Sequence, residues 1–432
     1  MNLDDLIREG IKDSSGTFTV SKEKALEKMS AFHLPSDTAW VLKVVQAAVA
    51  STCTEIDVRQ TSTATEFHLS GPTGWTLTQL ENEFYQIERS PLDHLKHGLW
   101  NVSLNGMRPF SLSLPNYPEM LFWDGEKMAR KPAKPVAKTV LAVSHRTRQE
   151  GRGIPILSNI EAASKNAAVA KELTQSGFTC SKPLRLDNRR LDALQLCPVH
   201  GLSSSSYPVQ MGFLKGDLPE LVLPDATISG FTKPKEVDPG MLKVFQAEAT
   251  IPSRLALVCM VTAHLRKVTK GKTTVWDSYH CESLIYWVRD GVVVDRTRPK
   301  VGSSGCCSIA IFASADGLRS DAGGFVLLKD DGFAARENEV CQLAAEFVAQ
   351  VNLRMQPLVD DARRTTRVLS GLATLGGIGV AFASPAHGIA ITMMGAYSFF
   401  TAGANEVEIS DRAATGLRDL QKHWSIRYPR RT

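Results

Sequence analysis

The pattern of apolar and polar positions along the chain predicts three parts. From residue 1 to about 200, helical and strand patterns follow one another, and glycine, serine and proline then become frequent between 200 and 240. Strand patterns resume from about residue 241, and a long helical pattern and an uncharged run follow. Because 432 residues exceed one comfortable hydrophobic core, we expect an α/β domain over 1–200, a second α/β domain over 201–345 and a helical region over 346–432.

The clearest helix and strand pair lies at residues 40–60. Its apolar residues recur at the spacing i, i+1, i+4 and i+5, which places them on one stripe of a helix. They are Trp40, Val41, Val44, Val45, Ala48 and Val49. A strand follows from Ile56, and a second alternating strand covers 64–71. Elsewhere in the first part, the pattern predicts helices at 21–34, 77–87, 90–105 and 158–176 and strands at 108–114, 119–128 and 138–147.

The second part is predicted to be rich in strands. Asp290 and Gly291 lie between two runs of β-branched and aromatic residues, which is a strong hairpin signal. Further strands are predicted at 255–265, 306–316 and 323–333, and a long helix at 337–364. Both domains are therefore expected to have an α/β fold.

The segment at residues 40–60 resembles an element of the GHKL ATPase superfamily, which includes DNA gyrase B, MutL, histidine kinases and the large heat-shock chaperone. In that family a helix carries a glutamate, an asparagine stands four residues later, and a strand of the type ATRIDI follows. The end of this pattern is present as ASTCTEIDV, from Ala50 to Val58. The resemblance implies a GHKL-like α+β sandwich, followed by a transducer-like α/β domain.

The side chains that carry the family's chemistry differ in this sequence. The glutamate, which acts as the general base, falls on Lys43, and the magnesium-binding asparagine falls on Ala47. A protonated lysine cannot accept a proton from the attacking water, and an alanine methyl cannot replace an oxygen ligand of magnesium. The adjacent Gln46 lies about 100° around the helix from Ala47, so it is not expected to substitute.

The family's next motif, Asp-x-Gly-x-Gly, falls on residues 70–74. Ser70 stands in place of the adenine-binding aspartate, and of the motif's glycines only Gly74 is kept. We therefore interpret Lys43, Ala47, Ser70 and Gly74 as positions of a degenerate nucleotide site. We expect no catalytic residue, no metal and no obligatory cofactor. Residual ATP binding stays open, because a serine can still make one hydrogen bond to a base.

Composition and charge limit the setting of the protein. A hydrophobic fraction of 43% and a charged fraction of 22% are typical of globular proteins. The net charge of +5 is mild, and nucleic acid is not expected as a partner. The N-terminal residues have no apolar signal-peptide core. The eight cysteines are scattered rather than regularly spaced, so a reducing cytoplasm is expected.

Two groups of cysteines are candidate sites. Cys197 with His200, and His280 with Cys281, could supply zinc ligands, but they do not have the spacing of a zinc site. Cys306 and Cys307 open a predicted strand, so one thiol is expected to face the core and the other to face outward. A redox role would need a basic neighbour that lowers a thiol pKa, and the sequence identifies none.

The most unusual segment is the uncharged run near the C-terminus. Between Arg367 and Glu406 there is no acidic or basic residue apart from His387. The run exceeds the roughly 20 residues that cross a bilayer, and Pro385 favours a break into two short helices. Arginines flank both ends, as the positive-inside rule expects for a hairpin entering from the cytoplasm.

We therefore predict a membrane-inserted hairpin at 368–404. Its expected lipid-facing residues are Leu369, Leu372, Leu375, Ile378, Val380, Phe382, Ile389, Ile391, Met394, Phe399 and Phe400. Polar residues within the run, such as Thr374 and Ser398, keep open the alternative that the hairpin is buried in protein.

Together these observations predict a non-enzymatic effector or adaptor. Its first two domains would bind a protein partner or a second copy of the chain, and its hairpin would insert in or perturb a membrane from the cytoplasmic side. The domain combination suggests bacterial defence or a stress response. One alternative is a nucleotide-dependent conformational switch or weak ATPase. Another is a structural subunit with a buried hairpin.

Overall fold

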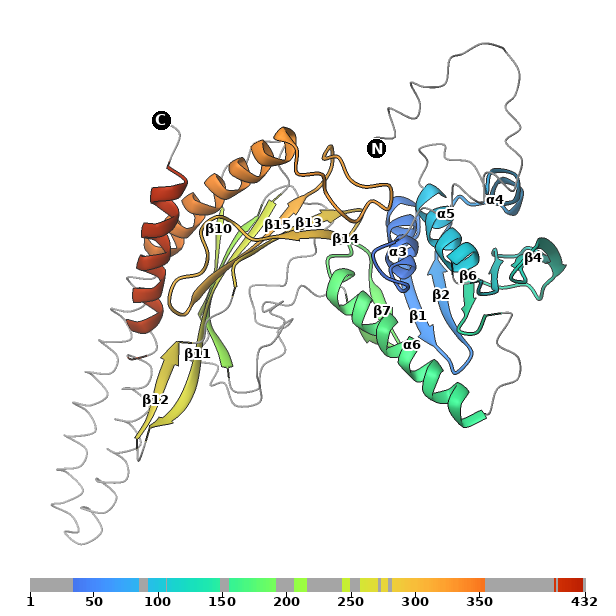
Figure 1. The fold of residues 1–432 in the computed structure, drawn as a ribbon, viewed down its shortest axis with the longest axis horizontal. Helices are drawn as coiled ribbons and strands as arrows, with labels where there is room; N and C mark the ends of the chain where they lie inside the picture. Colours follow the sequence, from blue (N-terminus) through green and yellow to red (C-terminus); the bar gives the residue numbers. More distant parts are fainter. Residues whose placement is uncertain are drawn as a thin grey trace, which may run out of the picture.

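The computed structural model has two β-sheets, each accompanied by helices (Figure 1). It describes residues 34–84, 92–105, 107–147, 155–191, 206–215, 243–248, 257–270, 273–278, 282–353, 408 and 411–429. The predicted helix at 21–34 lies almost entirely outside these residues. The two sheets support an α/β architecture, while the domain limits 1–200, 201–345 and 346–432 stay predictions.

The first sheet is mixed. Its described strands are β1 (Glu55–Gln60), β2 (Ala64–Ser70), β3 (Phe110–Ser113), β4 (Glu119–Trp123), β5 (Met128–Pro132), β6 (Thr139–Ser144), β7 (Leu184–Leu186) and β8 (Arg189–Arg190), in the order β5-β4-β3-β6-β2-β1-β7-β8. Neighbouring strands are antiparallel except β1 and β7, which are parallel. Burial alternates along β2, so one of its faces is buried, whereas Ile56, Asp57 and Val58 of β1 are all buried.

The helices of the first part confirm most of the predicted periodicity. They are α3 (Trp40–Ala50), α4 (Leu77–Glu83), α5 (Leu92–Trp100) and α6 (Pro155–Ser176), and a π-helical turn covers Asn101–Asn105. The helix α3 contacts both α5 and α6. Trp40 at its start lies edge-on to Phe67 of β2, with 5.8 Å between the ring centroids. The helix predicted from the apolar stripe is therefore anchored on the sheet.

The second sheet is also mixed. Its described strands are β9 (Ser206–Lys215), β10 (Lys243–Glu248), β11 (Leu257–Lys270), β12 (Thr273–Ser278), β13 (Leu284–Arg289), β14 (Val292–Thr297) and β15 (Cys307–Ser314), in the order β10-β9-β11-β15-β13-β14 with β12 beside β11. The predicted Asp290-Gly291 hairpin joins β13 to β14, and both turn residues have positive φ. This is the geometry that an Asp-Gly hairpin turn requires.

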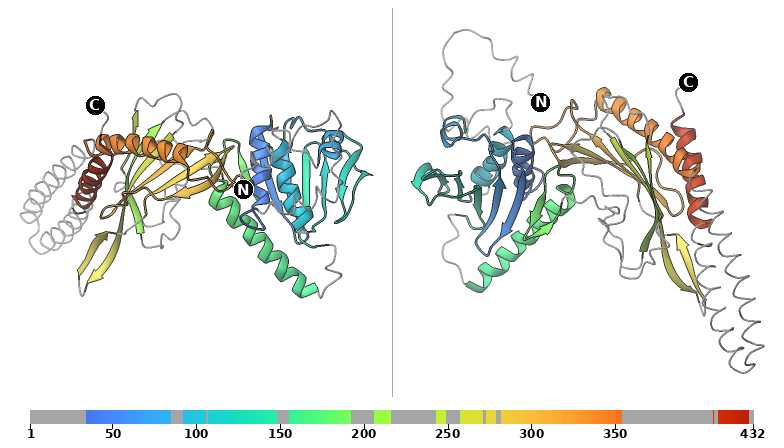
Figure 2. Two further views of the ribbon diagram at one scale, coloured as in Figure 1. Left: turned by 45° about the horizontal axis from the view of Figure 1, so that its top comes forward. Right: turned by 180° about the vertical axis from the view of Figure 1, so that it is seen from behind.

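Two helices follow the second sheet, at residues 331–353 and 411–427. Figure 2 shows them running beside each other over the sheet, and Asn352 donates a hydrogen bond to Gln421 between them. The predicted hairpin at 368–404 lies outside the described residues. Among the residues that the structure describes, no helix combines the length and apolarity needed to cross a bilayer.

Two predicted elements differ in the structure. The strand predicted at 323–333 is instead a loop up to residue 330. Its cause is Asp321, whose Oδ1 accepts the backbone N–H groups of Phe325 and Val326, each at 3.0 Å. An aspartate that takes up consecutive backbone donors competes with the strand ladder. The helix predicted from residue 337 begins earlier, at 331.

Direct contacts join the two sheets into one molecule. Phe178, just after α6, lies edge-on to Tyr286 of β13 and Phe312 of β15, with ring centroids 6.2 and 6.0 Å away. The hydroxyl of Thr179 donates to the carbonyl of Gly291 at 3.0 Å. Buried apolar residues from both parts form one continuous core. The turn of the second sheet is thus placed against the helices of the first.

Candidate functional site

The helix α3 supplies the wall of the candidate site. Its residues from Trp40 to Ala48 are all buried, because it is enclosed by the first sheet, α5 and the β13–β14 turn. Gly98 of α5 makes this possible, since a Cβ there would stand 3.1 Å from both the Lys43 Cβ and the Trp40 carbonyl oxygen. The absence of a side chain at Gly98 lets the two helices approach closely.

The second domain covers the end of the Lys43 side chain. Lys43 is only 2% exposed, and its Nζ lies 4.5 Å from the centre of the Phe325 ring. The same Nζ is 3.0 Å from the position that a Cβ would take at Gly324. No ion pair joins this ammonium to another residue in the part of the chain that the structure describes. The lysine therefore spans from the first domain to the 318–328 loop of the second.

A cleft of about 480 Å³ opens beside Lys43, between the two domains. The cleft is lined by both acidic and basic side chains. They come from α3, α5, the β13–β14 turn and the 318–328 loop. The ionisable residues are Lys43, Asp93, His94, His97, Arg289, Asp290 and Asp321. The His94 Nε2 and the Asp290 Oδ2 lie 3.0 Å apart across the two domains, and Asp93 pairs with Lys96 at 2.6 Å. The balance of charge does not favour a strongly anionic or cationic ligand.

Burial changes the protonation of the cleft. Burial, with a further effect from the nearby Arg289, lowers the pKa of Lys43 to about 8, against the opposing charges of Asp321 and Asp290. Burial and the charge of Lys43 lower the pKa of His97 to about 3. Although burial acts in the opposite direction, the hydrogen bond from His94 holds the pKa of Asp290 below its usual value. At neutral pH the cleft therefore contains a neutral His97 and a lysine near its titration point.

The predicted magnesium position is closed. Ala47 has no exposed surface and does not line the cleft. Its neighbour Gln46 is also buried, and its Nε2 donates to the carbonyl of Arg289 at 3.1 Å. The amide is thus engaged in holding the second domain rather than turned toward the Ala47 position.

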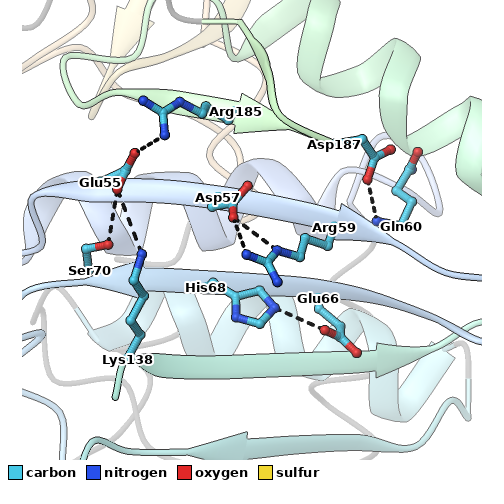
Figure 3. A network of polar contacts seen from close by, with 10 residues as sticks. All are labelled: Glu55, Asp57, Arg59, Gln60, Glu66, His68, Ser70, Lys138, Arg185 and Asp187. Carbon is cyan, nitrogen blue, oxygen red and sulfur yellow. Dashed lines mark hydrogen bonds and ion pairs between the residues drawn. The ribbon is translucent and has the colours of Figure 1, made fainter. Parts of the chain in front are cut away.

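The predicted adenine position lies apart from the cleft. The Ser70 hydroxyl donates to Glu55 at 3.3 Å, and Glu55 also pairs with Arg185 at 2.6 Å and Lys138 at 3.9 Å (Figure 3). Gly74 is exposed, with φ +73° and no atom near the place of a Cβ. The structure therefore brings Lys43 and Ala47 together on α3, while Ser70 and Gly74 do not line the same cleft.

Sequence reasoning missed the contribution of the second domain. Arg289, Asp290 and Asp321 line the cleft opposite Lys43. The Asp-Gly pair signalled a hairpin, but nothing in its residues signalled that this turn would face α3. Arg289 itself is held by its guanidinium, which donates to the carbonyls of Ala315 and Leu318, each at 2.8 Å.

The cysteine predictions have different outcomes. Cys197, His200, His280 and Cys281 lie outside the described residues. The prediction that one of Cys306 and Cys307 faces outward is wrong, because both are buried. The helix at 411–427 covers both thiols. The sequence does not indicate that this helix packs against the start of β15.

Comparisons with known proteins concern the fold. No protein-family model matches the chain, and no curated protein matches it by sequence. The chain is similar to the N-terminal domain of a DNA repair protein, at 11% identity and a TM-score of 0.37 over 77% of this chain and 99% of that structure.

Two structures of the ATPase domain of Aquifex aeolicus MutL, a mismatch repair endonuclease, are similar at 10% and 9% identity, each with a TM-score of 0.30. They cover 71% and 70% of this chain and 98% and 97% of their own. At these identities and TM-scores, neither a family nor an activity of this chain follows from the similarity.

Proposed function

We propose that this protein is a non-catalytic, GHKL-like effector or adaptor, whose two α/β domains form a fixed surface for a protein partner or a second copy of the chain. One observation carries the proposal. The position of the family's general base holds Lys43, whose ammonium is enclosed under Phe325 and Gly324 of the second domain. The next chemical position holds the fully buried Ala47.

The chemistry of these residues supports a loss of hydrolysis. A general base must accept a proton from water, and the pKa of Lys43, at about 8, leaves most of this amine protonated at neutral pH. Magnesium prefers several oxygen ligands in octahedral geometry. The side-chain amide of the adjacent Gln46 donates a hydrogen bond from its nitrogen to the Arg289 carbonyl. Its oxygen could supply only one ligand. The Lys43 and Ala47 positions therefore offer neither a general base nor a set of metal ligands.

Calorimetry with ATP and magnesium tests this part of the proposal. We expect no heat of binding with the full-length protein. The alternative, a nucleotide-dependent switch, would give micromolar binding that Ser70→Arg abolishes. Ser62→Arg is a matched control, because Ser62 is an exposed serine in the turn before β2. Loss of binding with Ser70→Arg but not with Ser62→Arg would replace the proposal by the switch.

Membrane contact through residues 368–404 is the second part of the proposal. It rests on the uncharged run of the sequence, which lies outside the described residues. Full-length protein should float with anionic liposomes and release an enclosed dye. The double variant Ile378→Glu/Phe399→Glu should do neither, because a charged side chain within a bilayer costs about 2.5–3.5 kcal/mol.

Ile160→Glu provides the control for the liposome experiment. Ile160 is an exposed apolar residue of α6, outside the uncharged run. Its substitution should leave flotation unchanged. Absence of flotation and dye release from the unmodified protein would favour the structural-subunit alternative with a buried hairpin.

A further inference from the structure

Two neighbouring thiols meet beneath the C-terminal helix. The Sγ atoms of Cys306 and Cys307 are 3.9 Å apart, and both side chains are 2% exposed. Consecutive residues of a strand point to opposite faces, but Cys306 precedes β15 and lies in a turn with Gly305, whose φ is +56°. Paired backbone hydrogen bonds between Ser304 and Cys307, at 3.0 and 2.9 Å, close this turn. The turn therefore directs both sulfurs to the same side.

The helix at 411–427 rests on these sulfurs. The Cys306 thiol contacts the carbonyl oxygen of Arg412 and the Cys307 thiol that of Ala413, each at 3.6 Å. Gly416 faces both, since a Cβ there would stand 3.0 Å from the Cys306 Sγ and 3.2 Å from the Cys307 Sγ. The fit leaves no room for a larger residue, so the state of the sulfurs and the position of the helix are linked.

The two thiols have different acidities. A hydrogen bond from Cys307, supported by the charge of Arg412, lowers the pKa of Cys306 even though burial opposes it. The same hydrogen bond and burial raise the pKa of Cys307 well above its usual value. Two thiols in contact, one with a lowered pKa, have the arrangement of a redox-active pair. The other described cysteines with a shifted pKa, such as Cys53 and Cys259, have it raised by burial.

We propose that Cys306 and Cys307 form a reversible oxidation site for a hydroperoxide, and that closing their disulfide loosens the helix at 411–427. The Cys306 thiolate attacks one peroxide oxygen, the O–O bond breaks, and hydroxide or alkoxide leaves. The resulting sulfenic acid is attacked by the Cys307 sulfur. Its hydroxyl leaves as water with the Cys307 proton, and the S–S bond forms. The two electrons of the pair reduce the peroxide.

Bond formation changes the contacts with the helix. The sulfurs must approach from 3.9 Å to about 2.05 Å, which changes their 3.6 Å contacts with the carbonyl oxygens of Arg412 and Ala413. Adjacent residues have Cα atoms only about 3.8 Å apart, below the usual range for disulfides of about 4.4–6.8 Å. A strained disulfide of this kind is readily reduced, which makes the oxidation reversible.

Peroxide treatment of the full-length protein tests the site. We expect the peptide that contains both cysteines to lose two hydrogen atoms in mass, and dithiothreitol to restore them. Amide hydrogen exchange in the first turns of the 411–427 helix should become about tenfold faster on oxidation. Met107 is 39% exposed, so its oxidation to the sulfoxide serves as an internal check that the peroxide has reacted with the protein. Oxidised Met107 with both thiols still reduced, or a disulfide with unchanged exchange, would overturn the proposal.

Single variants separate the roles of the two sulfurs. With Cys307→Ala, dimedone should trap a sulfenic acid at Cys306, and no disulfide should form. With Cys306→Ala, Cys307 should remain unlabelled. Cys53→Ala, which removes a buried thiol of the first domain, should leave the reaction of the unmodified pair unchanged. Equal labelling of Cys306 and Cys307 in these variants would contradict the assigned order, and the measurement on the unmodified protein stands even if a variant fails to fold.

Discussion

At the scale of single residues, Lys43 is the clearest departure from an ordinary core. Its side chain is enclosed, yet the described residues provide no carboxylate within ion-pair distance. Such a residue costs stability when it is charged, because burial removes the hydration of the ammonium. The contact with the Phe325 ring offsets only part of this cost.

Replacing Lys43 by Met should stabilise the protein at neutral pH. The pKa of Lys43 falls from 10.5 to about 8 on folding, which corresponds to a penalty on the order of 3 kcal/mol below pH 8. The substitution removes this penalty but also removes a cation–π contact of about 1 kcal/mol. The free energy of unfolding should therefore rise by about 2 kcal/mol. Urea unfolding of the variant and the unmodified protein at pH 7 measures this difference.

The pH dependence of the free energy of unfolding, compared between Lys43→Met and the unmodified protein, provides a second readout. Between about pH 8 and 10.5 the unfolded chain holds a proton that the fold has released, so the stability of the unmodified protein should rise across this window. The advantage of Lys43→Met should therefore shrink as pH rises. Lys171→Met, at an exposed position of α6, should show no such trend. A constant difference between Lys43→Met and the unmodified protein would contradict the lowered pKa.

At the scale of elements, the β13–β14 turn is fitted to the first domain. Gly291 has φ +72°, and a Cβ there would stand 3.1 Å from the Val49 side chain and 3.2 Å from the Cys180 Cα. Gly317 has a similar φ of +75° with nothing within 4 Å. We expect Gly317→Ala to cost about 1 kcal/mol through the backbone alone, and Gly291→Ala about 2–4 kcal/mol because of the added clash.

Thermal and urea unfolding of both glycine variants measures the two costs. Their difference isolates the contact between the turn and the first domain, since the backbone cost is common to both. Equal losses for Gly291→Ala and Gly317→Ala would mean that the turn does not pack against Val49 and Cys180.

The loop at 318–328 depends on a single carboxylate. Asp321 accepts two backbone N–H groups at 3.0 Å, and this loop covers Lys43. Asp321→Ala should cost about 1–3 kcal/mol, because two donors lose their acceptor. Hydrogen exchange of Phe325 and Val326 should become faster. Asp316→Ala, at an exposed position just after β15, is the control. Unchanged protection at Phe325 would show that Asp321 does not hold the loop.

The elements show where sequence reasoning succeeds and where it fails. Local periodicity and turn chemistry predict helix α3, strands β1 and β2 and the Asp290-Gly291 turn. Each of these signals lies within a short segment of the sequence. The 323–328 region has strand-like residues, but Asp321 removes two of its backbone donors. The cleft could not be predicted, because it brings together residues such as Lys43 and Arg289, which lie far apart in the sequence. The hydrogen bond from Gln46 to Arg289, which helps to hold these parts together, joins residues 243 positions apart.

At the scale of the whole molecule, direct hydrogen bonds join the two domains. Arg296 of β14 donates to the carbonyl of Gln175 at 2.7 Å and to the Ser176 hydroxyl at 3.1 Å. With the Gln46 and Thr179 bonds, these link three segments of the first domain to the second. A nucleotide-driven rearrangement would have to break these hydrogen bonds, so the fold is suited to a permanent arrangement.

Introducing the two side chains of the GHKL pattern should therefore not create ATP hydrolysis. In Lys43→Glu/Ala47→Asn, the new carboxylate would lie over Phe325 and near Asp290 and Asp321, and the new amide would enter a fully buried position. We expect a less stable protein that releases no phosphate from ATP with magnesium. The stabilised Lys43→Met variant serves as the folded control in the same assay. Phosphate release above that of Lys43→Met would contradict this prediction. It would also show that a nucleotide can reach α3 beneath the second domain.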